Sequence, residues 1–272
     1  SKCYGLIDRF SEDLDIVIGA DAIGMDLGPL LEAGTSRNKR ELFAKEANDR
    51  AMSFLENELI PTMKKDSEAE LNEKLSFELI KEDLAFYVTY PASYGDTYVL
   101  PRLKFEMSSL SALLPSENRK VKPLLFRAFP ALDDGKDVYV RTLSPERTFW
   151  EKAMILHQEA HRVLGSVPRR YSRHYYDIVK IYRSPIGESA MKNLELMEEV
   201  RTFTEAFYNR SWAKFGEAKP GSCRLSPNAI QINALRRDYI DMGKMIFDKN
   251  APTFDEILTV LAEIEATING GR

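Results

Sequence analysis

The stretch EDLDIVI, residues 12–18, sets two aspartates into a run of apolar residues. In an extended strand successive side chains point to opposite faces, so Asp13 and Asp15 share one face, opposite Leu14 and Ile16. The pattern therefore predicts a strand with one apolar and one acidic face. Two neighbouring carboxylates suit either a solvated entrance to a half-exposed strand or a pair of oxygen ligands for Mg²⁺, which prefers hard donors.

The composition limits the function class. The chain has 272 residues, of which 44% are hydrophobic, as in an ordinary globular protein. No apolar run is long enough to span a bilayer, and residues 1–10 lack the apolar centre and cleavage site of a signal peptide. These features favour a cytoplasmic protein without a membrane partner. Cys3 and Cys223 are too few for a disulfide framework or a zinc site, so any metal chemistry is expected to use oxygen ligands.

Positive charge is concentrated in one segment. The formal net charge of -4 argues against a generally basic nucleic-acid-binding surface. Residues 162–183, RVLGSVPRRYSRHYYDIVKIYR, nevertheless carry six Lys or Arg against one acid. This segment suits a confined polyanion such as a triphosphate or an RNA end, or it is the solvated face of a helix. Helical spacing places several of its side chains on one polar stripe: Arg170, Arg173 or His174, Asp177 and Lys180.

The first half of the chain predicts a mixture of helices and strands. A helix is expected from about residue 39 to residue 65, kinked or ended by Pro61. Two extended segments follow, at residues 75–92 and 98–110. In the second segment the apolar positions alternate with Lys104, Glu106 and Ser108, so Glu106 is a third acid on a polar strand face.

The three acids are expected to converge at one edge of a mixed sheet. The carboxylates of Asp13, Asp15 and Glu106 should then lie within about 8 Å of one another, twice the separation of a metal-ion pair. If Glu106 pointed to the opposite side of the sheet, Glu78 or Asp83 would be the candidates to replace it.

From residue 144 onward the pattern is helical. Ser144 is a plausible N-cap, followed by Pro145 at the first helical position and Glu146 in the first turn. Further helices are expected at residues 171–182, 190–208, 228–247 and 254–268. The sequence thus predicts an α+β fold, with a mixed domain at residues 1–143 and a helical domain at residues 144–272.

Two motifs of other enzyme classes are incomplete. The segment HQEAH places His157 and His161 four residues apart on a helix, but Gln158 stands where the zinc motif has glutamate. The glycines between residues 19 and 28 do not form a phosphate-binding P-loop. The sequence therefore does not favour a zinc hydrolase or a P-loop enzyme.

Five segments carry a family resemblance: SKCYGLIDRFSEDLDIVI, LPRLKFEMS, SPERTFWEKAMILH, YSRHYYDI and LRRDYIDM. In this order, over nearly the whole chain, they resemble the AbiEii/AbiGii toxin family of nucleotidyltransferases, within the DNA polymerase β-like superfamily. The resemblance implies a polymerase β-like domain followed by a helical domain. It also implies a toxin of a bacterial toxin–antitoxin or phage-defence system, with a cognate antitoxin. Such a toxin would transfer a nucleoside monophosphate from an NTP to RNA, at the tRNA 3′ acceptor end, with Mg²⁺ or Mn²⁺.

The resemblance also assigns roles to residues. Asp13 and Asp15 would be the catalytic, metal-binding pair and Glu106 the third metal ligand, while Lys152 and Asp177 would be catalytic residues from the helical domain. Nucleotide contacts are expected from Ser1, Lys2, Ser11 and Lys152, and RNA contacts from Arg169, Arg170, Arg173, His174 and Lys180. The superfamily's Gly-Gly-Ser/Thr turn falls upstream of Ser1, so a chain that starts there is expected to lack part of the phosphate cradle.

Two alternatives share most of these features. A metal site activates a hydroxyl whatever molecule carries it, so the acceptor could be a protein hydroxyl rather than RNA. The second alternative is a protein that binds nucleotide or antitoxin without turnover. The presence of the three acids and Lys152 argues against it, and the glycine turn expected upstream of Ser1 argues for it.

Overall fold

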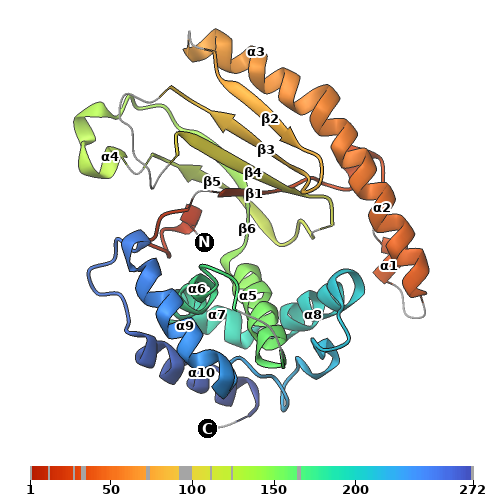
Figure 1. Ribbon diagram of the computed structural model, residues 1–272, viewed down its shortest axis with the longest axis vertical. Helices are drawn as coiled ribbons and strands as arrows, with labels where there is room; N and C mark the ends of the chain where they lie inside the picture. Colours follow the sequence, from red (N-terminus) through yellow and green to blue (C-terminus); the bar gives the residue numbers. More distant parts are fainter. Residues whose placement is uncertain are drawn as a thin grey trace. The chain divides into compact units, whose positions relative to one another are not determined.

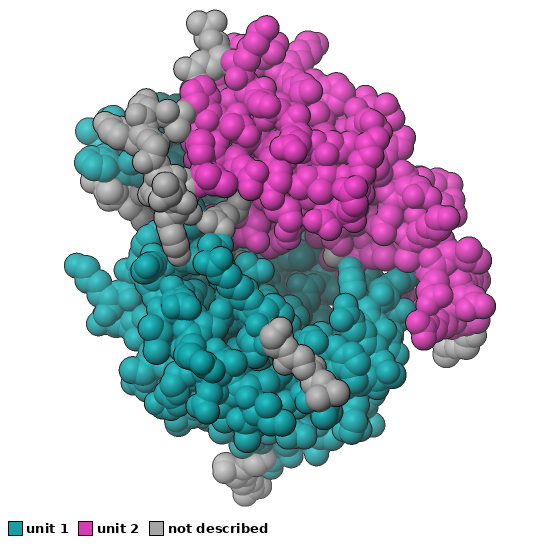
Figure 2. Space-filling model, in the orientation of Figure 1, with its two compact units in different colours: residues 1–10, 114–272 teal, residues 11–113 magenta. Residues whose placement is uncertain are grey.

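The computed structural model describes residues 2–11, 13–26, 28–31, 35–71, 74–91, 100–110, 112–123, 125–163 and 167–270, with residues 2, 29, 127 and 128 by their backbone only. The fold is α+β, with a mixed sheet in the first half of the chain and helices in the second, as the sequence predicted (Figure 1). The chain forms two compact units, unit 1 from residues 1–10 and 114–272 and unit 2 from residues 11–113 (Figure 2). None of the helices described is both long and apolar enough to cross a membrane.

Unit 2 is built on a four-stranded mixed sheet in the order β1-β4-β3-β2. Its strands are β1 (Asp13–Val17), β2 (Ser76–Ile80), β3 (Ala85–Thr89) and β4 (Arg102–Ser108). β1 runs parallel to β4 and places Asp13 opposite Lys104 and Asp15 opposite Glu106, while the other two pairs are antiparallel. Paired residues in a sheet share a face, so this register gathers the charged side chains on one side.

The segment expected as a single extended stretch at residues 75–92 forms the hairpin of β2 and β3. The chain reverses through a turn at residues 81–84, where Leu84 has a φ of 46°. A branched residue rarely adopts a positive φ, so the local sequence gives no sign of this turn. The hairpin adds a strand to the sheet that the sequence alone did not separate.

The apolar face of the sheet packs against a long helical segment. It consists of α2 (Arg37–Phe54), the π-helical turn η3 (Leu55–Leu59) and α3 (Ile60–Leu71), which run along the sheet in Figure 1. Leu55 and Ile60 are buried against Phe86 and Met107. The wide turn ends two residues before Pro61, whose ring would clash with the carbonyl four residues earlier in a regular helix. The predicted kink at Pro61 is therefore a wide turn within a helix that continues.

Two short elements lie before α2 in unit 2. They are η2 (Asp21–Ile23) and α1 (Gly28–Leu31).

Unit 1 is mainly helical and has its own core. Its longer helices are α5 (Pro145–Ala160), α6 (Ser172–Tyr182), α7 (Pro185–Lys192), α8 (Leu194–Tyr208), α9 (Ala229–Met242) and α10 (Phe254–Ile268). It also contains short helical elements: η1 (Lys2–Tyr4), α4 (Leu125–Ala128), η4 (Pro130–Leu132), η5 (Phe215–Glu217) and η6 (Gly243–Met245). The Ser144 side chain accepts a hydrogen bond from the backbone N–H of Arg147, which confirms the predicted cap of α5. Phe149 and Trp150 of this helix are fully buried in the core.

Two parts of unit 1 had no counterpart in the sequence-based expectations. One is an antiparallel pair, β5 (Ser116–Val121) and β6 (Val138–Leu143). The other is a short pairing between residues 8–10 and residues 245–247, in which the N–H of Phe10 donates to the carbonyl of Met245 at 2.7 Å and the N–H of Phe247 donates to the carbonyl of Asp8 at 2.9 Å. Residues 8–10 are thereby fixed in unit 1. The domain boundary expected near residue 143 stays a prediction.

Gly187 offers a direct test of the packing in unit 1. A Cβ atom at this buried position in α7 would lie 1.9 Å from the carbonyl oxygen of Tyr182, at the end of α6. We therefore expect Gly187→Ala to lower the free energy of unfolding by about 2 kcal/mol or more, because a backbone atom must move. Gly243→Ala is the control, since nothing lies within 4 Å of its Cβ position, and it should stay within about 0.5 kcal/mol of the wild type. Equal stability of the two variants in urea denaturation would contradict this account.

Candidate functional site

The polar face of the sheet in unit 2 brings together the three acids that the sequence singled out. Asp13, Asp15 and Glu106 each have one carboxylate oxygen that lies within 4.8 Å of the corresponding oxygen of the other two. This is closer than the separation expected from the sequence, so the predicted convergence is confirmed. The parallel register of β1 and β4 is the cause, because it places Asp15 directly beside Glu106. The hydroxyl of Ser11 donates to Asp13 at 2.7 Å and holds one carboxylate of the group.

This donor set fits a divalent metal ion. Carboxylate oxygens are the hard ligands that Mg²⁺ and Mn²⁺ favour, and oxygens around one octahedral Mg²⁺ are roughly 3–4 Å apart. A group within 4.8 Å therefore needs only small side-chain rotations to bind one. The side chains are partly exposed, so an ion and a substrate oxygen can reach them.

A lysine lies within the same acidic group. The ammonium nitrogen of Lys104 is 2.6 Å from Oε1 of Glu106 and 3.9 Å from Oδ2 of Asp83. The sequence placed Lys104 and Glu106 on one face of a strand, and this contact confirms it. The hydrogen bond to Glu106 raises the pKa of the Lys104 ammonium above its usual value, so this group is charged at neutral pH.

Unit 1 contains a second charged cluster, which is buried. Asp177 on α6 has no exposed surface and accepts hydrogen bonds from Nε and Nη2 of Arg9, each at 2.8 Å. The ammonium of Lys152, on α5, is 2.8 Å from Oδ2 of the same carboxylate. Burial alone would raise the pKa of Asp177, but the charges of Lys152 and Arg9 outweigh it and hold the pKa well below its usual value. We call these three residues the Asp177 cluster.

The cluster changes how the sequence pattern of α6 is understood. Asp177 was expected on a polar stripe with Lys180, yet it points into the core of unit 1. A buried carboxylate is tolerated because two cations accompany it. Arg9 was not among the predicted site residues, because its partner is 168 positions away and no local pattern marks it. The only sign in the sequence is an arginine within the apolar segment GLIDRF.

His174 lies close to the same cluster. Its buried Nδ1 has no hydrogen-bond partner among the residues described. Burial and, next, the positive charges of Lys152 and Arg173 lower the pKa of His174 to about 3. At neutral pH the ring is therefore uncharged, and any RNA contact it makes would be a hydrogen bond rather than an ion pair.

The cations expected to contact RNA differ in how accessible they are. Arg169 is exposed, while Arg170 and Arg173 are partly buried. The backbone N–H of Arg170 donates to Asp238 at 2.6 Å, which fixes the turn before α6. The ammonium of Lys180 is 2.7 Å from Asp248, so its charge is already balanced within unit 1. Arg169 is thus the most exposed of the cations expected to contact RNA. Of the remaining expected nucleotide contacts, Ser1 and the side chain of Lys2 lie outside the described residues.

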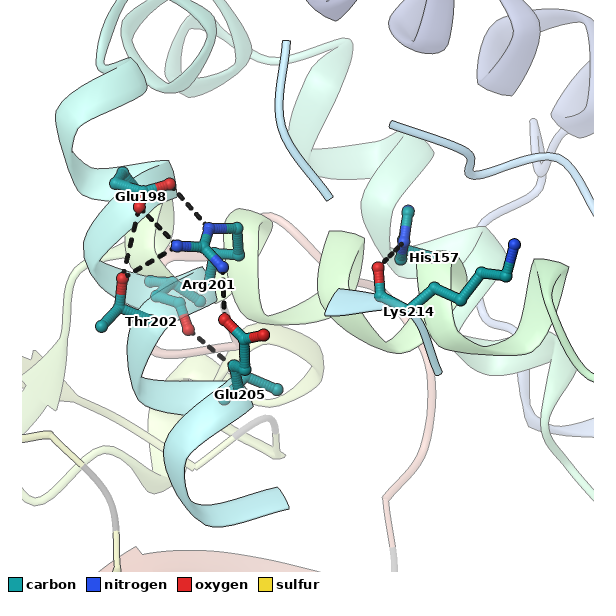
Figure 3. Close-up of polar contacts among 8 residues, drawn as sticks. His157, Glu198, Arg201, Thr202, Glu205 and Lys214 are labelled. Atoms are coloured by element: carbon teal, nitrogen blue, oxygen red, sulfur yellow. Dashed lines mark hydrogen bonds and ion pairs between the residues drawn. The ribbon is translucent and has the colours of Figure 1, made fainter. Parts of the chain in front are cut away.

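The histidines of the HQEAH segment have a structural role. Nδ1 of His157 accepts a hydrogen bond from the backbone N–H of Arg224 at 3.1 Å, so the ring proton is on Nε2. Nε2 in turn donates to the carbonyl of Lys214 at 3.1 Å (Figure 3). Burial lowers the pKa of His157 to about 4, which keeps the ring neutral. With both nitrogens engaged, His157 has no lone pair left for zinc.

The Asp177 cluster predicts a loss of stability when its anion is removed. In Asp177→Ala the cations of Arg9 and Lys152 would face each other without a counter-charge. We expect the free energy of unfolding to fall by about 3 kcal/mol or more, as for other buried pairs that lose one partner. Asp66→Ala, on the exposed side of α3, is the control and should change little. Urea denaturation at pH 7 measures both, and a similarly small loss in the two variants would contradict the buried ion-pair cluster.

The comparisons with known proteins agree with the geometry. The profile of the family described as nucleotidyl transferase AbiEii toxin, type IV toxin–antitoxin system, matches residues 1–260. No curated protein and no solved structure gave a significant match. The matched region covers both the carboxylates of unit 2 and the Asp177 cluster of unit 1, and it spans nearly the whole chain. The chain therefore belongs to the AbiEii family of nucleotidyltransferase toxins.

Proposed function

We propose that this toxin is a metal-dependent enzyme that transfers a nucleoside monophosphate from an NTP to RNA, at the 3′ acceptor end of tRNA. The convergence of Asp13, Asp15 and Glu106 within 4.8 Å supports the metal dependence most directly. Family membership implies an NTP substrate and a cognate antitoxin. An enzyme that uses NTPs and tRNA would work in the cytoplasm.

The reaction is a displacement at the α-phosphorus of the NTP. The acceptor hydroxyl loses its proton to water and its oxygen forms a bond to the α-phosphorus, while the bond from that phosphorus to the bridging oxygen breaks and pyrophosphate leaves. Bound Mg²⁺ or Mn²⁺ would supply positive charge for the attacking and leaving oxygens. Asp13, Asp15 and Glu106 would hold it, and the hydroxyl of Ser11 would keep Asp13 in place.

Lys152 is proposed to bind the phosphates of the nucleotide. Phosphoryl-transfer sites commonly use a lysine for this purpose, because a compact ammonium can follow the phosphate oxygens. The carboxylate of Asp177 is buried and bonded to Arg9 and Lys152, so we assign it a positioning role. It orders two cations that would otherwise repel each other.

The choice of RNA as acceptor is supported by the basic segment before and within α6. Arg169 is exposed, and Arg170 and Arg173 are partly exposed on the same stretch of chain. Cations that contact a sugar–phosphate backbone bind many sequences, which suits the shared features of tRNA molecules.

Loss of one carboxylate tests the proposed metal site. We expect Asp15→Asn to abolish nucleotide transfer in the full-length protein, because an amide binds a divalent ion poorly. Its free energy of unfolding should stay within about 0.5 kcal/mol of the wild type, since the side chain is exposed. The measurement is incorporation of labelled NTP into separate pools of RNA and protein, with Asp66→Asn on α3 as control. Transfer at the wild-type rate by Asp15→Asn would exclude this carboxylate from catalysis.

Removal of two arginines tests the acceptor. We expect Arg169→Ala/Arg170→Ala to weaken tRNA binding and to reduce the slope of log K against log salt by roughly one for each phosphate that the variant no longer binds. Binding of free NTP should change less. Lys64→Ala/Lys65→Ala on α3 removes the same charge from unit 2 and serves as control. If the affinity for tRNA and its salt dependence equal those of the control, a protein acceptor becomes the better proposal.

A further inference from the structure

The acidic face of unit 2 already holds one cation of the chain itself. The ammonium of Lys104 lies 2.6 Å from Oε1 of Glu106, closer than an ordinary hydrogen bond between neutral groups. Its side chain is only 24% exposed, so it is packed along the sheet rather than extended into water. The register of β1 and β4 places Lys104 beside Asp13 and Glu106 beside Asp15. The carboxylates therefore share this face with a lysine that competes for an oxygen of Glu106.

Lys104 alters the charge that a metal ion would meet. Asp13, Asp15 and Glu106 together carry three negative charges when ionised, and the ammonium reduces the total to two. A divalent ion that binds the carboxylates must either approach a positive charge or displace it. By Coulomb's law, a double and a single charge about 5 Å apart in water repel enough to weaken binding by about tenfold.

The structure also contains a second acceptor for the ammonium. Oδ2 of Asp83, in the turn between β2 and β3, lies 3.9 Å from Nζ of Lys104. The four-carbon stem of lysine is flexible, so a small rotation would bring the ammonium into contact with Asp83. The carboxylate of Asp83 is 64% exposed, and it can accept this bond without rearrangement of the core.

We propose that Lys104 is a resident counter-ion of the metal site, which occupies Glu106 when no metal is bound and moves to Asp83 when a divalent ion binds. This inference rests on the proposed function, because it takes the three carboxylates as the metal ligands. Lys104 lowers the affinity of the three carboxylates for a divalent ion when no nucleotide is present. Binding of the ion is then favoured when the phosphates of a nucleotide add their own negative charge. It is a positioning residue and takes no part in the transfer itself.

The test is titration of the full chain with Mn²⁺ alone, without nucleotide. Binding is measured by calorimetry or by the loss of the electron paramagnetic resonance signal of free Mn²⁺. Lys104→Met removes the charge and keeps the length of the side chain. We expect it to bind Mn²⁺ about tenfold more tightly than the wild type. Lys81→Met is the control, because Lys81 is in the same unit and pairs with Glu56 at 3.2 Å, outside the carboxylate group. The control should bind as the wild type does.

A second variant tests the movement of the ammonium. Asp83→Asn removes the alternative partner, so Lys104 should stay on Glu106 and Mn²⁺ should bind more weakly than in the wild type. This variant lies in an exposed turn and gives a result even if Lys104→Met does not fold. The double variant Lys104→Met/Asp83→Asn should bind as tightly as Lys104→Met, since Asp83 acts only through the lysine.

The outcomes separate the inference from the proposed function. Equal or weaker binding by Lys104→Met, with clear binding by the wild type, would overturn the counter-ion role alone. Unchanged binding by Asp83→Asn would overturn the movement to Asp83. Mn²⁺ binding that persists unchanged in Asp15→Asn, or that is absent from the wild type and from Lys104→Met, would overturn the metal assignment itself and this inference with it.

Discussion

A charged carboxylate without access to water has to be matched by positive charge. The Asp177 cluster meets this condition by joining one carboxylate and two cations, each from a separate part of unit 1. Asp177 is on α6, Lys152 on α5 and Arg9 in the segment that pairs with residues 245–247. Two helices and an otherwise irregular segment are thereby fixed relative to one another through a single side chain. The desolvation of these charges is expensive, so the arrangement persists only while all three are present.

The two charged clusters have opposite balance. The buried cluster of unit 1 has two cations and one anion, whereas the partly exposed face of unit 2 has three carboxylates and one ammonium, which contacts Glu106. The first is an electropositive environment, which suits phosphate oxygens, and the second is an electronegative one, which suits a divalent metal ion.

Local patterns in the sequence were sufficient for much of this structure. The alternation around Asp13 and Asp15 predicted β1, alternation in the segment LKFEM predicted the face that Glu106 shares with Lys104, and Ser144 with Pro145 predicted the start of α5. Each of these signals depends on residues only a few positions apart. The strands β5 and β6 gave no such signal, because both faces of this pair carry exposed side chains and the periodicity of burial is lost.

Features that depend on distant partners were not predictable in this way. Arg9 and the burial of Asp177 require knowledge that residue 9 meets residue 177, and nothing near either residue indicates it. The helical period of α6 places Asp177 with polar neighbours, but tertiary packing overrides that pattern once two cations are supplied from elsewhere. The role of Lys104 as a competitor for Glu106 depends on a distance, which periodicity cannot give.

The path of the chain also determines when each part of unit 1 becomes available during synthesis on the ribosome. Residues 1–10 belong to the same compact unit as residues 114–272, so unit 2 is synthesised as an insertion before the rest of unit 1 exists. Arg9 is made 168 positions before Asp177, which at about 5–20 residues per second corresponds to roughly ten to thirty seconds of waiting. During that interval the hairpin and helices of unit 2 can form, but the carboxylate that Arg9 binds in the finished fold has not yet been made. The Asp177 cluster can therefore form only after α6 has been synthesised. A chain whose synthesis stops before α6 lacks the cluster.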